Sequence, residues 1–180
     1  MTNQKETIRK FVSYINNKEY LGGFWLPNIQ RHFVWSEEQI ERLYDSILRE
    51  YPIGSFLIWR TKSDIKHRKF IDTWKDTIKI TDYYIPENGN PKMLVLDGQQ
   101  RIQSLLIGLS GSYNGKELYF NILSGDLKSP EDMRYDFSFM DKTAIFPWVK
   151  FKQIVSSDKK SRDIKKDILE KVTIKLDDEK

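Results

Sequence analysis

The sequence predicts an α/β (α+β) domain in which a small mixed sheet is flanked by helices. An apolar run at 93–96 leads through Asp97 and Gly98 into an amphipathic stretch at 99–109. This order indicates a strand, a tight turn and a helix in direct succession. Alternation of apolar and polar residues is typical of half-buried strands, and we read it in two later stretches, 117–122 and 135–139.

Two helices are expected before that turn. Apolar residues recur at helical spacing over about 5–17, and Gly22-Gly23 then breaks the chain. The second helix begins after Ser36, an N-cap whose partner Gln39 completes a capping box, and it ends before Pro52. Its predicted apolar face comprises Ile40, Leu43, Tyr44, Ile47 and Leu48, and a hydrophobic staple joins Trp35 to Ile40.

The other segments are less regular. Residues 53–59 are rich in β-formers and predict a buried strand, 60–69 predict a loop or an exposed edge, and 70–92 predict irregular structure. Charged residues dominate from about Lys150 onwards. We therefore expect a domain at 1–150 and a charged helical extension or linker at 151–180, which would lead to a missing C-terminal region.

Composition excludes several classes of function. A chain of 180 residues suits one domain, and its net charge of +4 is far from the dense basic surface of a dedicated DNA-binding protein. There is no cysteine for a disulfide or a thiolate metal site. No apolar run approaches a membrane span, and no signal peptide is evident, so we expect a soluble, cytoplasmic protein. The motifs of P-loop NTPases, HExxH metalloproteases and G-x-S-x-G hydrolases are absent.

The turn Asp97-Gly98-Gln99-Gln100-Arg101 is the first candidate site. Free backbone N–H groups and the positive end of the dipole make a helix start suitable for an anion, most often phosphate. Gly98 removes a side chain that would block a close ligand, and Arg101 adds a permanent charge. The structural alternative is a helix start in which Asp97 and Gln100 form a capping box.

A second polar cluster, Gln30-Arg31-His32, precedes the Ser36 helix. Arg31 could clamp a ligand held at a helix end, or it could simply pair on the surface with Glu37 or Glu38. The tryptophans at 25, 35 and 59 could stack a base or belong to the core. The basic run at 60–69 could contact a nucleic-acid backbone or be a solvated loop.

Taken together, these segments resemble one family. The stretch 26–35, the capped helix, Tyr51-Pro52-Ile53-Gly54 and the Asp97–Arg101 turn are similar to the DGQQR-containing N-terminal domain of GmrSD-type, modification-dependent restriction systems. Related domains occur in other bacterial phage-defence proteins. The order also resembles the ParB/sulfiredoxin superfamily, in which an arginine loop, a helix, a Pro-Ile strand and a G-x-x-R turn build a nucleotide pocket.

The resemblance implies a nucleoside-triphosphate pocket built by the Asp97–Arg101 turn with Gln30 and Arg31 facing it. Members are taken to bind, and often to hydrolyse, the nucleotide and to act with a separate HNH-type nuclease domain or subunit, which this chain lacks. We expect binding through Gln30, Arg31, Gly98 and Arg101. Catalysis is expected from Asp97, which would position Mg²⁺ or water, and from Gln99 and Gln100, which would orient the water.

Other functions stay open on the sequence alone. The main alternative is a module that binds DNA or a partner protein without hydrolysis, with the run 60–69 and the charged tail carrying the function. A weaker alternative is kinase-like phosphotransfer to a protein.

Overall fold

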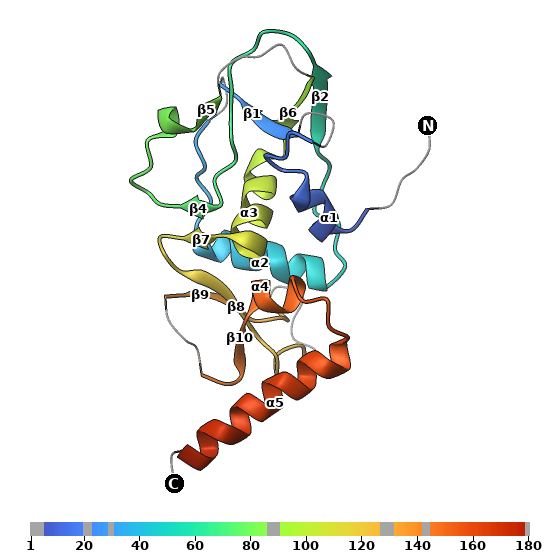
Figure 1. The fold of residues 1–180 in the computed structure, drawn as a ribbon, viewed down its shortest axis with the longest axis vertical. Coiled ribbons are helices and arrows are strands. Elements are labelled where there is room, and N and C mark those ends of the chain that lie inside the picture. Colours follow the sequence, from blue (N-terminus) through green and yellow to red (C-terminus); the bar gives the residue numbers. More distant parts are fainter. Residues whose placement is uncertain are drawn as a thin grey trace.

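The structure, a computed structural model, describes residues 6–19, 23–28, 31–85, 91–126, 132–141 and 145–178. Figure 1 shows a sheet at one end of the molecule, a layer of helices across the middle and a smaller sheet below them. The long helix α5 (Ser161–Asp178) projects from the end opposite the first sheet. Within these residues, no helix is long and apolar enough to cross a membrane.

The larger sheet is mixed and has five strands in the order β2-β6-β1-β3-β5. Its two central strands, β1 and β6, are parallel, and each other neighbouring pair is antiparallel. The carboxyl ends of β1 and β6 therefore lie at the same edge of the sheet. The strands span Phe24–Pro27 (β1), Leu57–Thr61 (β2), His67–Arg68 (β3), Tyr84–Ile85 (β5) and Lys92–Asp97 (β6).

Helix α3 (Gln99–Ser110) follows β6 directly and is the most buried helix of the described structure. It contacts α1 (Ile8–Ser13) and α2 (Glu37–Leu48), as Figure 1 shows. Tyr44 of α2 donates a hydrogen bond of 2.8 Å to the Leu105 carbonyl. A side chain at Gly108 would collide with the Tyr44 ring, so glycine permits this close approach of the two helices.

The smaller sheet is antiparallel and packs against α2. Its strands, in the order β10-β8-β9, are β8 (Glu117–Asn121), β9 (Phe137–Met140) and β10 (Trp148–Lys150). Phe151 opens α4 (Phe151–Val155) and is buried against the Tyr44 and Phe137 rings, so the core includes the first residue of the segment 151–180. The remaining elements are β4 (Thr73–Trp74), the 3₁₀ helix η1 (Ile80–Tyr83) and β7 (Ser112–Tyr113).

The small mixed sheet with flanking helices confirms the predicted α/β (α+β) class. The capping box at Ser36 is also confirmed, because the Ser36 hydroxyl accepts from the Gln39 N–H and the Gln39 carboxamide accepts from the Ser36 N–H. The predicted strand at 93–97 and helix at 99–109 match β6 and α3 closely.

Three sequence predictions were wrong. The first helix ends at Ser13, because Ile15 leaves it to bridge Phe24 of the sheet. The strand predicted at 53–59 begins at Leu57 and is a largely exposed edge, since β6 pairs with it on one side. The run 60–69 is not wholly solvated, because β3 lies between β1 and β5 with both of its side chains buried.

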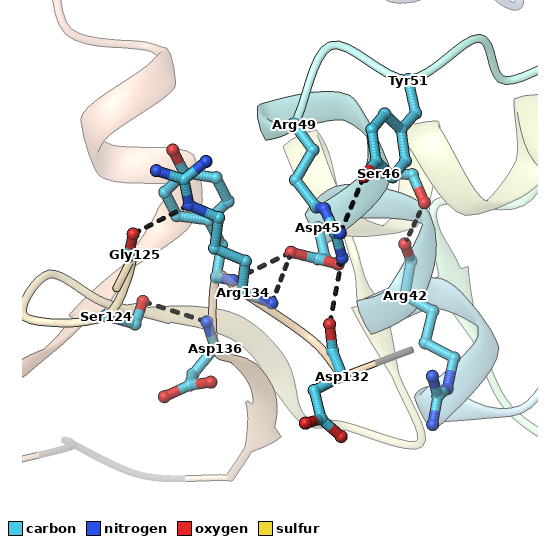
Figure 2. Close-up of polar contacts among 11 residues, drawn as sticks. Arg42, Asp45, Ser46, Arg49, Tyr51, Ser124, Gly125, Asp132, Arg134 and Asp136 are labelled. Atoms are coloured by element: carbon cyan, nitrogen blue, oxygen red, sulfur yellow. Dashed lines mark hydrogen bonds and ion pairs between the residues drawn. The ribbon is translucent and has the colours of Figure 1, made fainter. Parts of the chain in front are cut away.

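A buried carboxylate joins α2 to the chain that enters β9 (Figure 2). Asp45 is 5% exposed, and one of its oxygens accepts from the backbone N–H groups of Arg134 and Tyr135 at 3.1 and 2.9 Å. The other oxygen lies 3.3 Å from the Arg49 guanidinium, which also donates to the Asp132 carbonyl at 3.0 Å. The smaller sheet is thus fixed to the helix layer by polar contacts as well as by aromatic packing.

We expect Asp45→Ala to lower the free energy of unfolding by about 2–4 kcal/mol, because two N–H donors lose a charged acceptor. Chemical denaturation measures the change. Asp132→Ala is the matched control: it removes a carboxylate that is exposed rather than buried, and Arg49 bonds to the main-chain carbonyl of that residue, which the substitution keeps. Equal stability of both variants would contradict this role of Asp45.

Candidate functional site

The candidate site lies at the edge of the larger sheet where β1 and β6 both end. Open α/β sheets commonly bind ligands at such carboxyl ends. The chain passes from Asp97 at the end of β6 into α3 through Gly98, which has a φ of +83° and is the N-cap. No side chain caps this helix, so the proposed capping box of Asp97 and Gln100 does not form. The start of α3 thus keeps the uncapped character that an anion site needs.

Gly98 is required by its own surroundings. Its positive φ is strained for other residues, and a side chain here would collide with the Phe56 ring. Phe56 therefore occupies the space that a side chain at position 98 would need. The predicted contact of Gly98 with a ligand would run through its backbone.

The glutamines of the turn are buried and bonded to the backbone of other segments. Gln99 and Gln100 are each 8% exposed. The Gln99 carboxamide donates to the Val95 carbonyl at 2.6 Å. The Gln100 carboxamide donates to the His32 carbonyl at 2.9 Å and accepts from the Val34 N–H at 2.9 Å. Gln100 thus attaches the loop at 31–34 to the first turn of α3, and the catalytic role of both glutamines stays a prediction.

One turn further along α3, Gln103 makes a similar pair of bonds. Its carboxamide donates to the Ile71 carbonyl and accepts from the Ile71 N–H at 3.1 Å. Gln103 was not among the residues predicted from the sequence. The signal available was a third glutamine on the same helix face, three residues after Gln100.

Arg101 and Asp97 lie together on the exposed side of the turn. The Arg101 guanidinium donates to the Ile53 carbonyl, lies 3.7 Å from the Asp97 carboxylate and sits 5.4 Å from the centre of the Phe56 ring. The Asp97 side chain is 69% exposed, which leaves its oxygens accessible to a ligand. A side chain at Gly54 would collide with the Arg101 guanidinium, which explains the glycine of Tyr51-Pro52-Ile53-Gly54.

The Arg31 loop lies beside this turn because Gln100 holds it there. Arg31 is exposed, and Gln30 lies outside the described residues. In the described chain, Glu37 pairs with Lys116 and Glu38 with Arg42. The surface pairing of Arg31 with these glutamates is therefore not formed, and no ion pair of Arg31 is seen within the described ranges.

The tryptophans proposed to stack a base differ in their burial. Trp25 is buried edge-on to His67, with ring centres 5.6 Å apart, so it cannot stack a base. Trp35 packs against the core, whereas Trp59 on β2 is 43% exposed.

Among the residues that the structure describes, no group of three or more His, Cys, Asp or Glu could hold a metal ion. Asp97 fits Mg²⁺ only as a single ligand, with the remaining oxygens coming from phosphate and water.

Arg68 was not predicted as a site residue either, because it falls in the run 60–69 that was expected to be a loop or an exposed edge. Its side chain is 4% exposed, and its guanidinium donates to the Arg31 carbonyl at 3.4 Å. Burial lowers the pKa of this guanidinium, and the nearby Tyr84 hydroxyl partly offsets the shift. No sequence signal distinguished Arg68, because its neighbours in the chain are also charged.

Comparison with known proteins identifies the family. An uncharacterised protein of Methanocaldococcus jannaschii, MJ0686, is 36% identical over 92 residues, which are 51% of this chain and 15% of that protein. The chain therefore matches a small part of that relative's length. The family model of the GmrSD restriction endonuclease N-terminal domain matches residues 8–179. This match covers nearly all of the sequence, so the chain belongs to the GmrSD restriction endonuclease N-terminal domain family.

Proposed function

We propose that this domain binds a nucleoside triphosphate at the start of α3, hydrolyses it, and thereby regulates a DNA-cleaving partner in restriction and phage defence. The observation that supports the proposal is one convergence of groups. An uncapped helix start, the Arg101 guanidinium and the exposed Asp97 carboxylate lie together at the edge where β1 and β6 end. The loop that carries Arg31 is bonded to the same helix turn through Gln100.

In this proposal the protein groups act mainly by neutralising and positioning charge. The backbone N–H groups after Gly98 donate to phosphate oxygens, and Arg31 and Arg101 offset their negative charge. Bound Mg²⁺ would supply further charge neutralisation between the phosphates and Asp97. The Gln99 and Gln100 carboxamides already bond to the backbone and hold the turn in shape. To orient the attacking water, Gln100 would have to release a backbone partner, whereas Gln99 could use its carboxamide oxygen while its NH₂ group stays bonded to Val95.

The partner in this proposal is an HNH-type nuclease domain or subunit, and DNA is a possible further ligand. Family membership supports the link to restriction. A thermal-shift panel of ATP, GTP, CTP and UTP with Mg²⁺ tests nucleotide binding, because a ligand of the native state raises its apparent stability. DNA binding that weakens with salt and that no nucleotide affects would instead favour the DNA-binding module.

We expect Arg101→Ala to weaken nucleotide binding by about 1.5–3 kcal/mol, the range for hydrogen bonds to charged groups. Isothermal calorimetry measures the affinity. Arg60→Ala is the matched control, since it removes an exposed arginine from the neighbouring strand β2. If Arg101→Ala binds as tightly as the parent protein, Arg101 does not belong to the site.

We expect Asp97→Ala to abolish phosphate release while it changes stability by less than about 1 kcal/mol. Its carboxylate is 69% exposed and does not cap α3, so its ion pair with Arg101 contributes little. A phosphate assay and a melting curve on the same variant separate the two effects. Asp64→Ala, which removes another exposed carboxylate, serves as the control. Unchanged phosphate release would exclude Asp97 from catalysis.

We expect Gln100→Ala to lower the free energy of unfolding by about 1–3 kcal/mol, because two backbone bonds to the loop at 31–34 are lost. Denaturant titration measures this, with the exposed Gln153→Ala as control. Phosphate release measured well below the unfolding transition then tests the catalytic role. Full stability with no turnover would show that Gln100 acts in chemistry rather than in attachment.

A further inference from the structure

Arg68 is a buried cation on β3, which lies between β1 and the edge strand β5 of the larger sheet. It lies on β3, opposite Leu26 of β1 and Tyr84 of β5. Leu26 and Arg68 are directly opposite each other, so their side chains share one face of the sheet. Leu26 belongs to the main core, and Arg68 is 4% exposed.

The Arg68 guanidinium is short of acceptors. It carries five N–H donors, yet within the described ranges its hydrogen bond is the one to the Arg31 carbonyl, at the long distance of 3.4 Å. No Asp or Glu of the described chain forms an ion pair with it. Two other arginines with little exposed side-chain area differ: Arg49 has a carboxylate, a carbonyl and a hydroxyl as partners, and Arg101 has a carboxylate and a carbonyl.

Such an arrangement is costly without a ligand. A buried charge is normally paired, because removing it from water costs several kcal/mol that the partner must offset. The lowered pKa of Arg68 has the same cause, desolvation. An anionic ligand at this place would supply the missing partner.

The position of Arg68 joins it to the start of α3. Its guanidinium contacts the carbonyl of Arg31, and the next carbonyl along the chain, that of His32, accepts from Gln100 in the first helical turn. The uncapped start of α3, the Arg31 loop and Arg68 are thus connected by consecutive contacts. On β5, the Tyr84 hydroxyl donates a hydrogen bond to the side chain of Asn28, which precedes Arg31 in the chain. This bond attaches the amino-terminal end of the Arg31 loop.

We propose that Arg68 is a third phosphate-binding arginine, which pairs from beneath the Arg31 loop with an oxygen of the polyphosphate held at the start of α3. This inference rests on the proposed function and adds a residue to that site. Arg101 approaches the turn from the side of Phe56, and Arg68 approaches from β3. The phosphate chain would then be bound between two planar guanidinium groups.

The test uses Arg68→Met, with inorganic tripolyphosphate and ATP as probes and Arg60→Met as the matched control for the loss of one positive charge. We expect Arg68→Met to bind both probes about ten- to a hundredfold more weakly than the parent. Without ligand it should melt at or above the melting temperature of the parent, because an unpaired buried charge has been replaced by an apolar chain of similar length. Arg60→Met should behave like the parent in both measurements.

Other outcomes overturn the inference. Parental affinity of Arg68→Met, or a melting temperature well below that of the parent with binding retained, would show that Arg68 is structural. If Arg68→Met fails to fold, Arg68→Lys decides: it keeps the charge but loses the planar fork, so parental affinity would again contradict the proposal. A parent that binds neither tripolyphosphate nor any nucleotide would sink the proposed function itself, which separates the two failures.

Discussion

The attachment of α3 by its own glutamines is the constraint on which the site depends. Gly98 offers no side chain to cap the helix, and the helix is instead fixed further along. Gln99 bonds to β6, Gln100 to the loop at 31–34 and Gln103 to Ile71. Each carboxamide acts as the donor or acceptor that a backbone group would otherwise supply. These bonds attach β6, the loop at 31–34 and Ile71 to the same helix. Buried polar groups that are hydrogen-bonded to defined backbone partners favour a single arrangement of these segments.

This attachment leaves the first turn of α3 held from two sides. On one side Phe56 packs against Gly98, and the glycine at 54 admits the Arg101 guanidinium. On the other side Gln100 fixes the loop of Arg31. The groups at the edge of the sheet are therefore positioned before any ligand arrives. In the proposed function, donors preorganised in this way would stabilise developing charge without a reorganisation cost during hydrolysis.

The parts of the fold that could be predicted from sequence are those set by local interactions. The Ser36 capping box, the strand at 93–97 and the helix after Gly98 each depend on residues within a few positions of one another. The failures concern long-range contacts. Ile15 leaves its helix for a strand 9 residues away, and Arg68 is buried because β1 and β5 flank it. At the site, the Asp97–Arg101 turn was predicted from the sequence, but the partners of its glutamines were not. A glutamine carboxamide can hydrogen-bond to backbone groups or to a water molecule equally well, so its sequence position does not say which it does.

The charges around the start of α3 are unbalanced within the described chain. The Arg101 charge is shared between a carbonyl and one exposed carboxylate, and Arg68 has a single distant carbonyl. In the proposed function, an anionic ligand would offset these charges and would in return stabilise the native state by mass action. The Arg31 loop contacts both Arg68 and Gln100, so it connects the buried arginine to the start of α3. A ligand at the start of α3 would act on this loop directly, and through the loop a partner nuclease would distinguish the loaded from the empty domain.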